Sequence, residues 1–241
     1  MSIWILATLA AFFLKGLCGF ANTLVFSTIV GFTSSNLEIS PLELILSFPS
    51  NLIMAIKERR SIRWRISLPL ILLVMAGSIP GAFVLKNSGA GLVKLIFGGV
   101  IVLAGVSMLL KEFGVLKKTA PAKWELLLIG SVSGVLCGLY GIGVLVAVCI
   151  NRMTEDPHIV KGNVCVIFMS SGIFRMILYA VCGVFTWPIL KQSLMLLPFM
   201  LIGLIAGMLF SDRIHAKKLK KCVCIVLILS GIVLLLKNLV G

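Results

Sequence analysis

Gly-Leu-Cys-Gly-Phe-Ala-Asn at residues 16–22 interrupts an otherwise apolar stretch near the start of the chain. A second glycine-rich stretch, Gly134–Gly143, aligns with it through Cys18 and Cys137, which are 119 positions apart. Duplicated bundles of membrane helices with glycine breaks at corresponding places are typical of secondary transporters. The two stretches therefore predict a duplicated transporter fold.

Further matches extend the duplication along the chain. Gly77–Gly81 corresponds to Gly203–Gly207, and Gly105 with Lys111 corresponds to Gly231 with Lys237, all at an offset of 126. We expect a first membrane repeat over 1–112, a cytoplasmic linker over 113–123 and a second membrane repeat over 124–241.

Composition places the chain in a membrane. Hydrophobic residues make up 60% of it and the mean hydropathy is +1.16, which excludes an ordinary soluble domain. Apolar stretches of about 20 residues recur, the length needed to cross a bilayer. They are Ile66–Leu85, Leu95–Leu110, Pro188–Phe210 and Leu219–Leu236, with a shorter one at Leu42–Ile56 and a longer one at Val164–Leu190. Met1–Leu14 lacks the basic start of a signal peptide.

The net charge of +14 indicates membrane topology rather than nucleic-acid binding. No basic stretch is interleaved with aromatic residues, as a nucleic-acid surface would be. Eight plain crossings would place 11 Lys and Arg on the cytoplasmic side and nine outside. If segments 2–31 and 124–150 each enter and leave on one side, the cytoplasmic loops are 57–65, 111–123, 151–161 and 211–221. The count then becomes 16 to four, which agrees better with the positive-inside rule.

The predicted fold is therefore an all-α polytopic membrane protein of two inverted repeats. Each repeat contains a broken, re-entrant first helix pair and three transmembrane helices. Non-helical backbone at membrane depth must be satisfied by protein or by a water-filled cavity, so both breaks should meet in the interior.

The ordered set of motifs resembles the TauE/SafE family of sulfite and organosulfur anion exporters over essentially the whole chain. The likeness is carried by the two glycine breaks, the Pro49-Ser50-Asn51 run, the basic loop Arg59–Trp64 and the paired Gly-x-x-x-Gly motifs. The chain departs from the family pattern at Arg63, where an acidic residue is common, and at Phe20–Asn22, where further glycines are common. The resemblance implies a cell-membrane transporter, inner or plasma, of a small sulfur-containing anion.

Lys15 and Arg175 are the two cations inside apolar segments. A cation at bilayer depth is costly unless it faces water or a partner, so both are candidate substrate ligands. The alternative is that each extends to the headgroups. With two interior cations and no carboxylate expected at mid-membrane, we predict an anionic substrate.

The glycine breaks are the second candidate element. Half-helix N-termini hold anions through free N–H groups, and glycines there allow backbone to approach a ligand. These glycines are Gly19, Gly138, Gly141 and Gly143. For Gly77, Gly81, Gly203 and Gly207 we expect helix packing instead.

Hydroxyl and amide side chains in the apolar segments complete the predicted substrate site. They are Asn22, Thr23, Ser50, Asn51, Ser170 and Ser171. Pro49 has no N–H group and therefore leaves a helix carbonyl without its usual donor. An equal alternative for its neighbours Ser50 and Asn51 is to donate a hydrogen bond to the backbone instead of contacting a substrate.

Other functional classes fit the sequence less well. The equivalent positions of Cys18 and Cys137 leave open a membrane thiol electron carrier, although no Pro adjoins either cysteine. An aquaporin-like channel would need Asn-Pro-Ala at each break. No nucleophile–base–acid set and no zinc spacing is visible, so we expect no enzyme activity, cofactor or metal, and no nucleic-acid partner.

Overall fold

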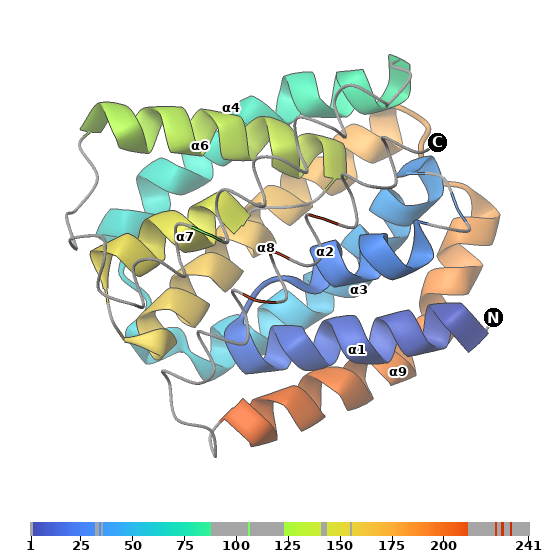
Figure 1. Cartoon of the computed structure of the whole chain (residues 1–241). Coiled ribbons are helices and arrows are strands. Elements are labelled where there is room, and N and C mark those ends of the chain that lie inside the picture. The colour runs from blue at the N-terminus through green and yellow to red at the C-terminus, as the bar shows by residue number, and fades with distance from the viewer. Residues whose placement is uncertain are drawn as a thin grey trace.

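The computed structural model describes residues 2–31, 34, 36–87, 123–140, 144–154 and 156–211, with isolated positions 106, 225, 228 and 232. Within these residues the regular structure is helical, as predicted (Figure 1). The predicted linker 113–123, apart from its last residue, lies outside the described residues. So do nearly all of the predicted third crossings, 95–110 and 219–236.

The first glycine break divides two helices. Helix α1 (Ser2–Cys18) ends before it, and α2 (Asn22–Val30) begins after it and folds back along α1 (Figure 1). Gly19 and Ala21 have φ angles of +90° and +75°. Glycine adopts this left-handed region readily, whereas alanine pays a steric cost there. The backbone therefore reverses where the sequence predicted.

Two long helices complete the described part of the first half. They are α3 (Asn36–Lys57) and α4 (Trp64–Asn87), joined by a short 3-10 turn, η1 (Arg59–Ser61). Helix α3 begins before the predicted apolar stretch Leu42–Ile56, so the residues that precede this stretch belong to the same continuous helix.

The second half repeats this order. It consists of α6 (Lys123–Tyr140), α7 (Val144–Met153), α8 (Pro157–Val181) and α9 (Trp187–Ser211). Helix α8 starts at Pro157, and the Asp156 side chain accepts a hydrogen bond from the His158 backbone at 2.9 Å. The predicted segment Val164–Leu190 is wrong at its end, because the chain turns between α8 and α9, where Gly183 has a φ of +68°.

The main helix contacts recur when the two halves are exchanged. The most extensive ones join α1 to α9 and α4 to α6, and α3 packs against α8 at the centre. Helix α3 also packs against α9, as α8 does against α4. Each of these contacts therefore has an equivalent when α1 is exchanged with α6, α3 with α8 and α4 with α9. The orientation of the two repeats relative to the membrane stays a prediction.

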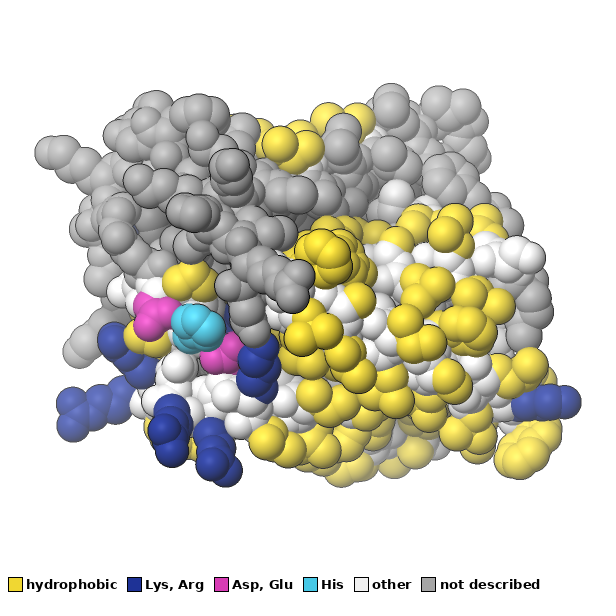
Figure 2. All heavy atoms as spheres, turned by 90° about the horizontal axis from the view of Figure 1, so that it is seen from below, with side chains coloured by type: hydrophobic (Ala, Val, Ile, Leu, Met, Phe, Trp, Pro, Cys, Tyr) yellow, Lys and Arg dark blue, Asp and Glu magenta, His cyan; other side chains and the backbone are white. Residues whose placement is uncertain are grey.

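The surface is that of a multi-pass membrane protein. Helices α3, α4, α8 and α9 contain segments long and apolar enough to cross a bilayer. On the face seen in Figure 2, apolar side chains cover much of the described surface, and most of the basic side chains lie at its left end.

Contacts at one end of the bundle join segments that the charge count predicts to be on the cytoplasmic side. The His158 ring Nδ1 lies 2.9 Å from Glu58 Oε2, which links the start of α8 to the end of α3. The Lys161 ammonium donates to the Ser211 hydroxyl, which donates to the Leu17 carbonyl at 3.1 Å. The 57–65 loop, the start of α8 and the end of α9 therefore lie together. Lys161, predicted to be a loop residue, is instead a buried residue of α8.

Candidate functional site

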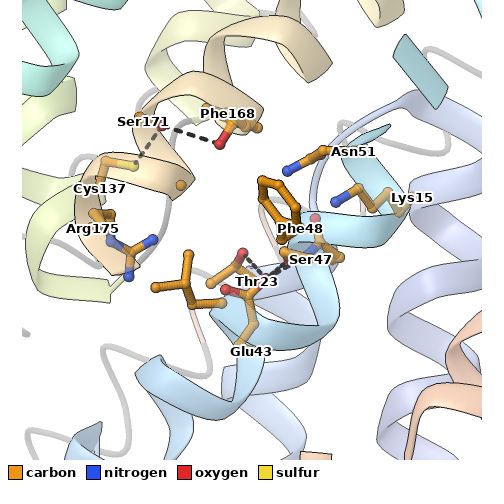
Figure 3. A pocket seen from close by; sticks show the side chains of 13 residues that line it. Lys15, Thr23, Glu43, Ser47, Phe48, Asn51, Cys137, Phe168, Ser171 and Arg175 are labelled. Atoms are coloured by element: carbon orange, nitrogen blue, oxygen red, sulfur yellow. Dashed lines mark hydrogen bonds between the residues drawn. The ribbon is translucent and has the colours of Figure 1, made fainter. Parts of the chain in front are cut away.

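A small internal pocket lies between helices of both halves (Figure 3). Helices α1, α2 and α3 of the first half face α6 and α8 of the second. The lining residues are Lys15, Asn22, Thr23, Glu43, Leu44, Ser47, Phe48, Asn51, Cys137, Phe168, Ser171, Gly172 and Arg175. Polar and charged groups at the interface of two halves make this the candidate substrate site.

Arg175 supplies an incompletely satisfied guanidinium to the pocket. The side chain is 3% exposed, and one terminal nitrogen donates to the Tyr179 hydroxyl at 2.9 Å. The guanidinium carbon lies 5.2 Å from the centre of the Tyr179 ring, a cation–π arrangement. Its Nε is buried and has no hydrogen-bond partner. A buried donor without a partner is costly, so this atom is poised to receive an acceptor.

Lys15 brings the second cation, from α1. It is 1% exposed, and its ammonium lies 5.6 Å from the centre of the Phe12 ring. Figure 3 shows Lys15 and Asn51 on one side of the pocket and Arg175 and Cys137 on the other. Within the described residues, neither Lys15 nor Arg175 lies within salt-bridge distance of a carboxylate. The burial of both cations excludes extension to the headgroups for these two residues.

Glu43 places a carboxylate in the interior near the two cations, where the sequence analysis expected none. It is 1% exposed and lines the pocket. Its Oε1 accepts hydrogen bonds from Asn22 Nδ2 at 2.5 Å, from Thr23 Oγ1 at 2.7 Å and from the Ser47 hydroxyl. Asn22 Nδ2 also donates to Ser47 Oγ at 2.6 Å. The first turn of α2 is thereby tied to α3 through one carboxylate oxygen.

Asn51 faces the same pocket one helical turn beyond Ser47. The side chain is 3% exposed, and its Oδ1 is buried with no hydrogen-bond partner. The pocket thus holds one donor and one acceptor, Arg175 Nε and Asn51 Oδ1, that the described protein leaves unpaired.

The structure brings together half of the residues predicted from sequence. The pocket is lined by Lys15, Asn22, Thr23, Asn51, Ser171 and Arg175. Gly19, Ser50 and Ser170 lie outside its lining. The contacts of Gly138, Gly141 and Gly143 lie outside what the structure describes.

Gly19 and Ser50 have structural roles, and their contact with substrate stays a prediction. A β-carbon on Gly19 would lie 2.9 Å from Lys161 Cγ, so the glycine allows the break to pack against α8. The Ser50 hydroxyl donates to the Ser47 carbonyl at 2.7 Å, which is the backbone-satisfying alternative. The packing role expected for the helix glycines is confirmed for Gly77, Gly203 and Gly207.

Sequence reasoning missed Glu43 and Ser47, together with the apolar wall of Leu44, Phe48 and Phe168. A signal for the polar pair was present. Glu43, Ser47 and Asn51 recur at intervals of four residues, which places them on one face of a helix. A polar face of that kind inside an apolar segment is directed toward the interior of a bundle.

The cysteines are unpaired in the described residues. Cys137 lines the pocket, with its sulfur 3.9 Å from Ser171 Oγ. Cys18 lies outside the lining and donates to the Leu14 and Phe20 carbonyls at 2.9 and 3.0 Å. No group of His, Cys, Asp and Glu suited to a metal ion occurs in the part of the chain that the structure describes.

Comparison with known proteins identifies the family of the chain. The family model described as sulfite exporter TauE/SafE matches residues 4–234. No curated protein and no solved structure is similar enough to count as a match. The match covers both halves, the two breaks and every residue that lines the pocket. The chain therefore belongs to the TauE/SafE family, whose members are membrane transporters that export sulfite and organosulfur anions.

Proposed function

We propose that the protein is a secondary transporter that exports a small sulfur-containing anion, such as sulfite or a sulfonate, across the cell membrane. One observation carries the proposal. Arg175 is buried in a pocket between the two halves, its Nε has no partner, and no described carboxylate lies within salt-bridge distance of it. An oxyanion in this pocket would supply both the missing acceptor and the missing charge.

Sulfite and sulfonates suit this arrangement because three oxygens share their negative charge. The planar guanidinium of Arg175 can donate to two of them at once, a stronger contact than a single hydrogen bond. Lys15 adds a second positive charge from the other side of the pocket. The Ser171 hydroxyl and the Asn51 amide are further polar groups within the lining.

Alternating access is the mechanism that the arrangement favours. The proposed halves, 1–112 and 124–241 joined by a cytoplasmic linker at 113–123, each contribute helices to the pocket. If the halves are inverted, rocking one against the other would expose the same residues first to one side and then to the other. The equivalent contacts of the two halves support this reading.

The thiol electron carrier remains the second candidate, and the site favours it less. Cys137 and Cys18 are at equivalent sequence positions, but only Cys137 lines the pocket. The family to which the chain belongs is one of anion transporters.

Flux measurements test the proposal directly. Purified protein in liposomes is loaded with sulfite, thiosulfate, sulfoacetate or taurine, and release is compared with liposomes that lack protein. We expect release of at least one of the anions and little release of taurine, which carries a balancing ammonium. A protein that releases none of the four, although it is folded and inserted, would contradict the proposal.

A further inference from the structure

Glu43 is an unusual group for an anion site. A buried carboxylate loses its hydration, and proteins normally compensate with a cation or with several hydrogen-bond donors. Here the donors to Oε1 are neutral: Asn22, Thr23 and Ser47. Within the described residues, the carboxylate is therefore held by hydrogen bonds and not by an ion pair.

Charged groups surround Glu43 at a longer range. Lys15 on α1 and Arg175 on α8 both interact electrostatically with it, and the uncharged thiol of Cys137 on α6 lines the same pocket. The residues that α2 and α3 direct at the carboxylate are uncharged, and no charged side chain of α4 or α9 belongs to the described lining. Ionised, Glu43 offsets one of the two cations; protonated, it leaves both uncompensated.

We propose that Glu43 is a proton-binding site that couples proton movement to the anion. This inference rests on the proposed anion transport and adds the coupling ion. The step is the addition of one proton from water to a carboxylate oxygen, and its later return to water on the opposite side of the membrane. No other bond changes.

A proton fits this site better than a metal cation does. The Asn22 and Thr23 donor atoms lie 2.5 and 2.7 Å from Glu43 Oε1, so these polar groups contact one another directly. A metal ion would have to separate them, because it needs a shell of oxygens at about 2.0–2.6 Å around itself. A proton requires no such space, and its binding to the other carboxylate oxygen leaves the three hydrogen bonds intact.

Coupling follows from the charges in the pocket. An anion binds more tightly when Glu43 is protonated, because the repulsion between the carboxylate and the anion is removed. By reciprocity, a bound anion also favours protonation. Anion and proton therefore travel together, each transport event moves one unit of charge fewer than the bare anion carries, and the two gradients together set the net direction.

The test uses thiosulfate, an anion that stays fully ionised near neutral pH. In liposomes holding the wild-type protein and a trapped pH dye, a thiosulfate gradient should move protons in the direction of the anion. Thiosulfate binding should also tighten as the pH falls, by at most about tenfold per pH unit. Glu43→Gln, which resembles the protonated side chain, should bind thiosulfate tightly at every pH and move no protons.

The matched control is Glu125→Gln. Glu125 forms an ion pair with Arg152 at 3.5 Å, and neither residue lines the pocket. This variant should retain both proton movement and pH dependence. Thiosulfate flux without proton movement in the wild type would overturn the proposed coupling but not the proposed anion site. This measurement uses the wild-type protein alone, so it does not depend on whether a variant folds. Flux that follows a sodium gradient, or an unchanged pH dependence in Glu43→Gln, would also overturn it. Absence of thiosulfate, sulfite and sulfoacetate binding altogether would instead remove the proposed function.

Discussion

Gly16 of α1 and Gly207 of α9 cross so closely that a β-carbon added to Gly207 would lie 3.0 Å from the Gly16 Cα. The corresponding crossing of α4 and α6 is formed by Gly77 and Gly134, where an added β-carbon would lie 2.8 Å from the opposite Cα. Each crossing joins one half to the other. The backbones that flank the pocket are thus held together by small residues, as is usual where membrane helices pack closely.

Replacing Gly207 by Ala should destabilise the protein. The new β-carbon would lie 2.1 Å from the Phe13 carbonyl oxygen, so α1 and α9 must separate. We expect a loss of at least about 1–3 kcal/mol, the usual cost of overpacking. Thermal unfolding in detergent measures it.

Gly172→Ala is the control for this measurement. The nearest atom to its added β-carbon is 3.7 Å away, and alanine is the better helix former by about 1 kcal/mol. The control should therefore melt at or above the wild-type temperature. Equal melting temperatures of Gly207→Ala and the wild type would contradict this prediction, because α1 and α9 would then separate without a loss of stability.

The positions of the breaks could be predicted from sequence because glycine marks backbone reversal. Gly19 adopts the left-handed conformation that its place in the break required. Ala21 adopts it as well, and nothing in its side chain indicated that. The packing role of Gly77 and Gly203 followed from their spacing alone.

Glu43 shows what sequence reasoning could not settle. It is the second residue of the apolar stretch Leu42–Ile56, where a carboxylate is normally explained by the headgroup region. The structure begins α3 six residues before Leu42 and buries Glu43 against α2. Which side of a helix faces the interior depends on tertiary packing, and that information is absent from local composition.

Topology should follow the gathering of basic residues at one end of the bundle. Single cysteines replacing exposed Arg59 and exposed Lys191, in a cysteine-free background, should react with a membrane-impermeant thiol reagent from opposite faces. Arg59→Cys should be cytoplasmic, because the positive-inside rule assigns the 57–65 loop to that side. Labelling of both positions from the same face, cytoplasmic or outside, would contradict the predicted inverted repeats.

The thiols should be dispensable for transport. Cys18→Ser combined with Cys137→Ser should keep anion flux within a few-fold, because a hydroxyl replaces each thiol in its hydrogen bonds to the Leu14 and Phe20 carbonyls and beside Ser171. Flux is measured in liposomes at matched protein content. Abolished flux, together with a reducible Cys18–Cys137 bond in the membrane, would support the electron carrier instead.

The central claim is that Arg175 binds the transported anion, and sulfite binding to Arg175 variants tests it most directly. Arg175→Gln should weaken binding by about 2–5 kcal/mol, the range for removing one partner of a buried charge pair. Arg175→Lys should recover part of the loss, because an ammonium keeps the charge but lacks the planar fork. Arg152→Gln, on the half-exposed ion pair with Glu125, should bind as the wild type does. Equal sulfite affinity in the wild type, Arg175→Gln and Arg175→Lys at matched protein levels would contradict an anion site at Arg175.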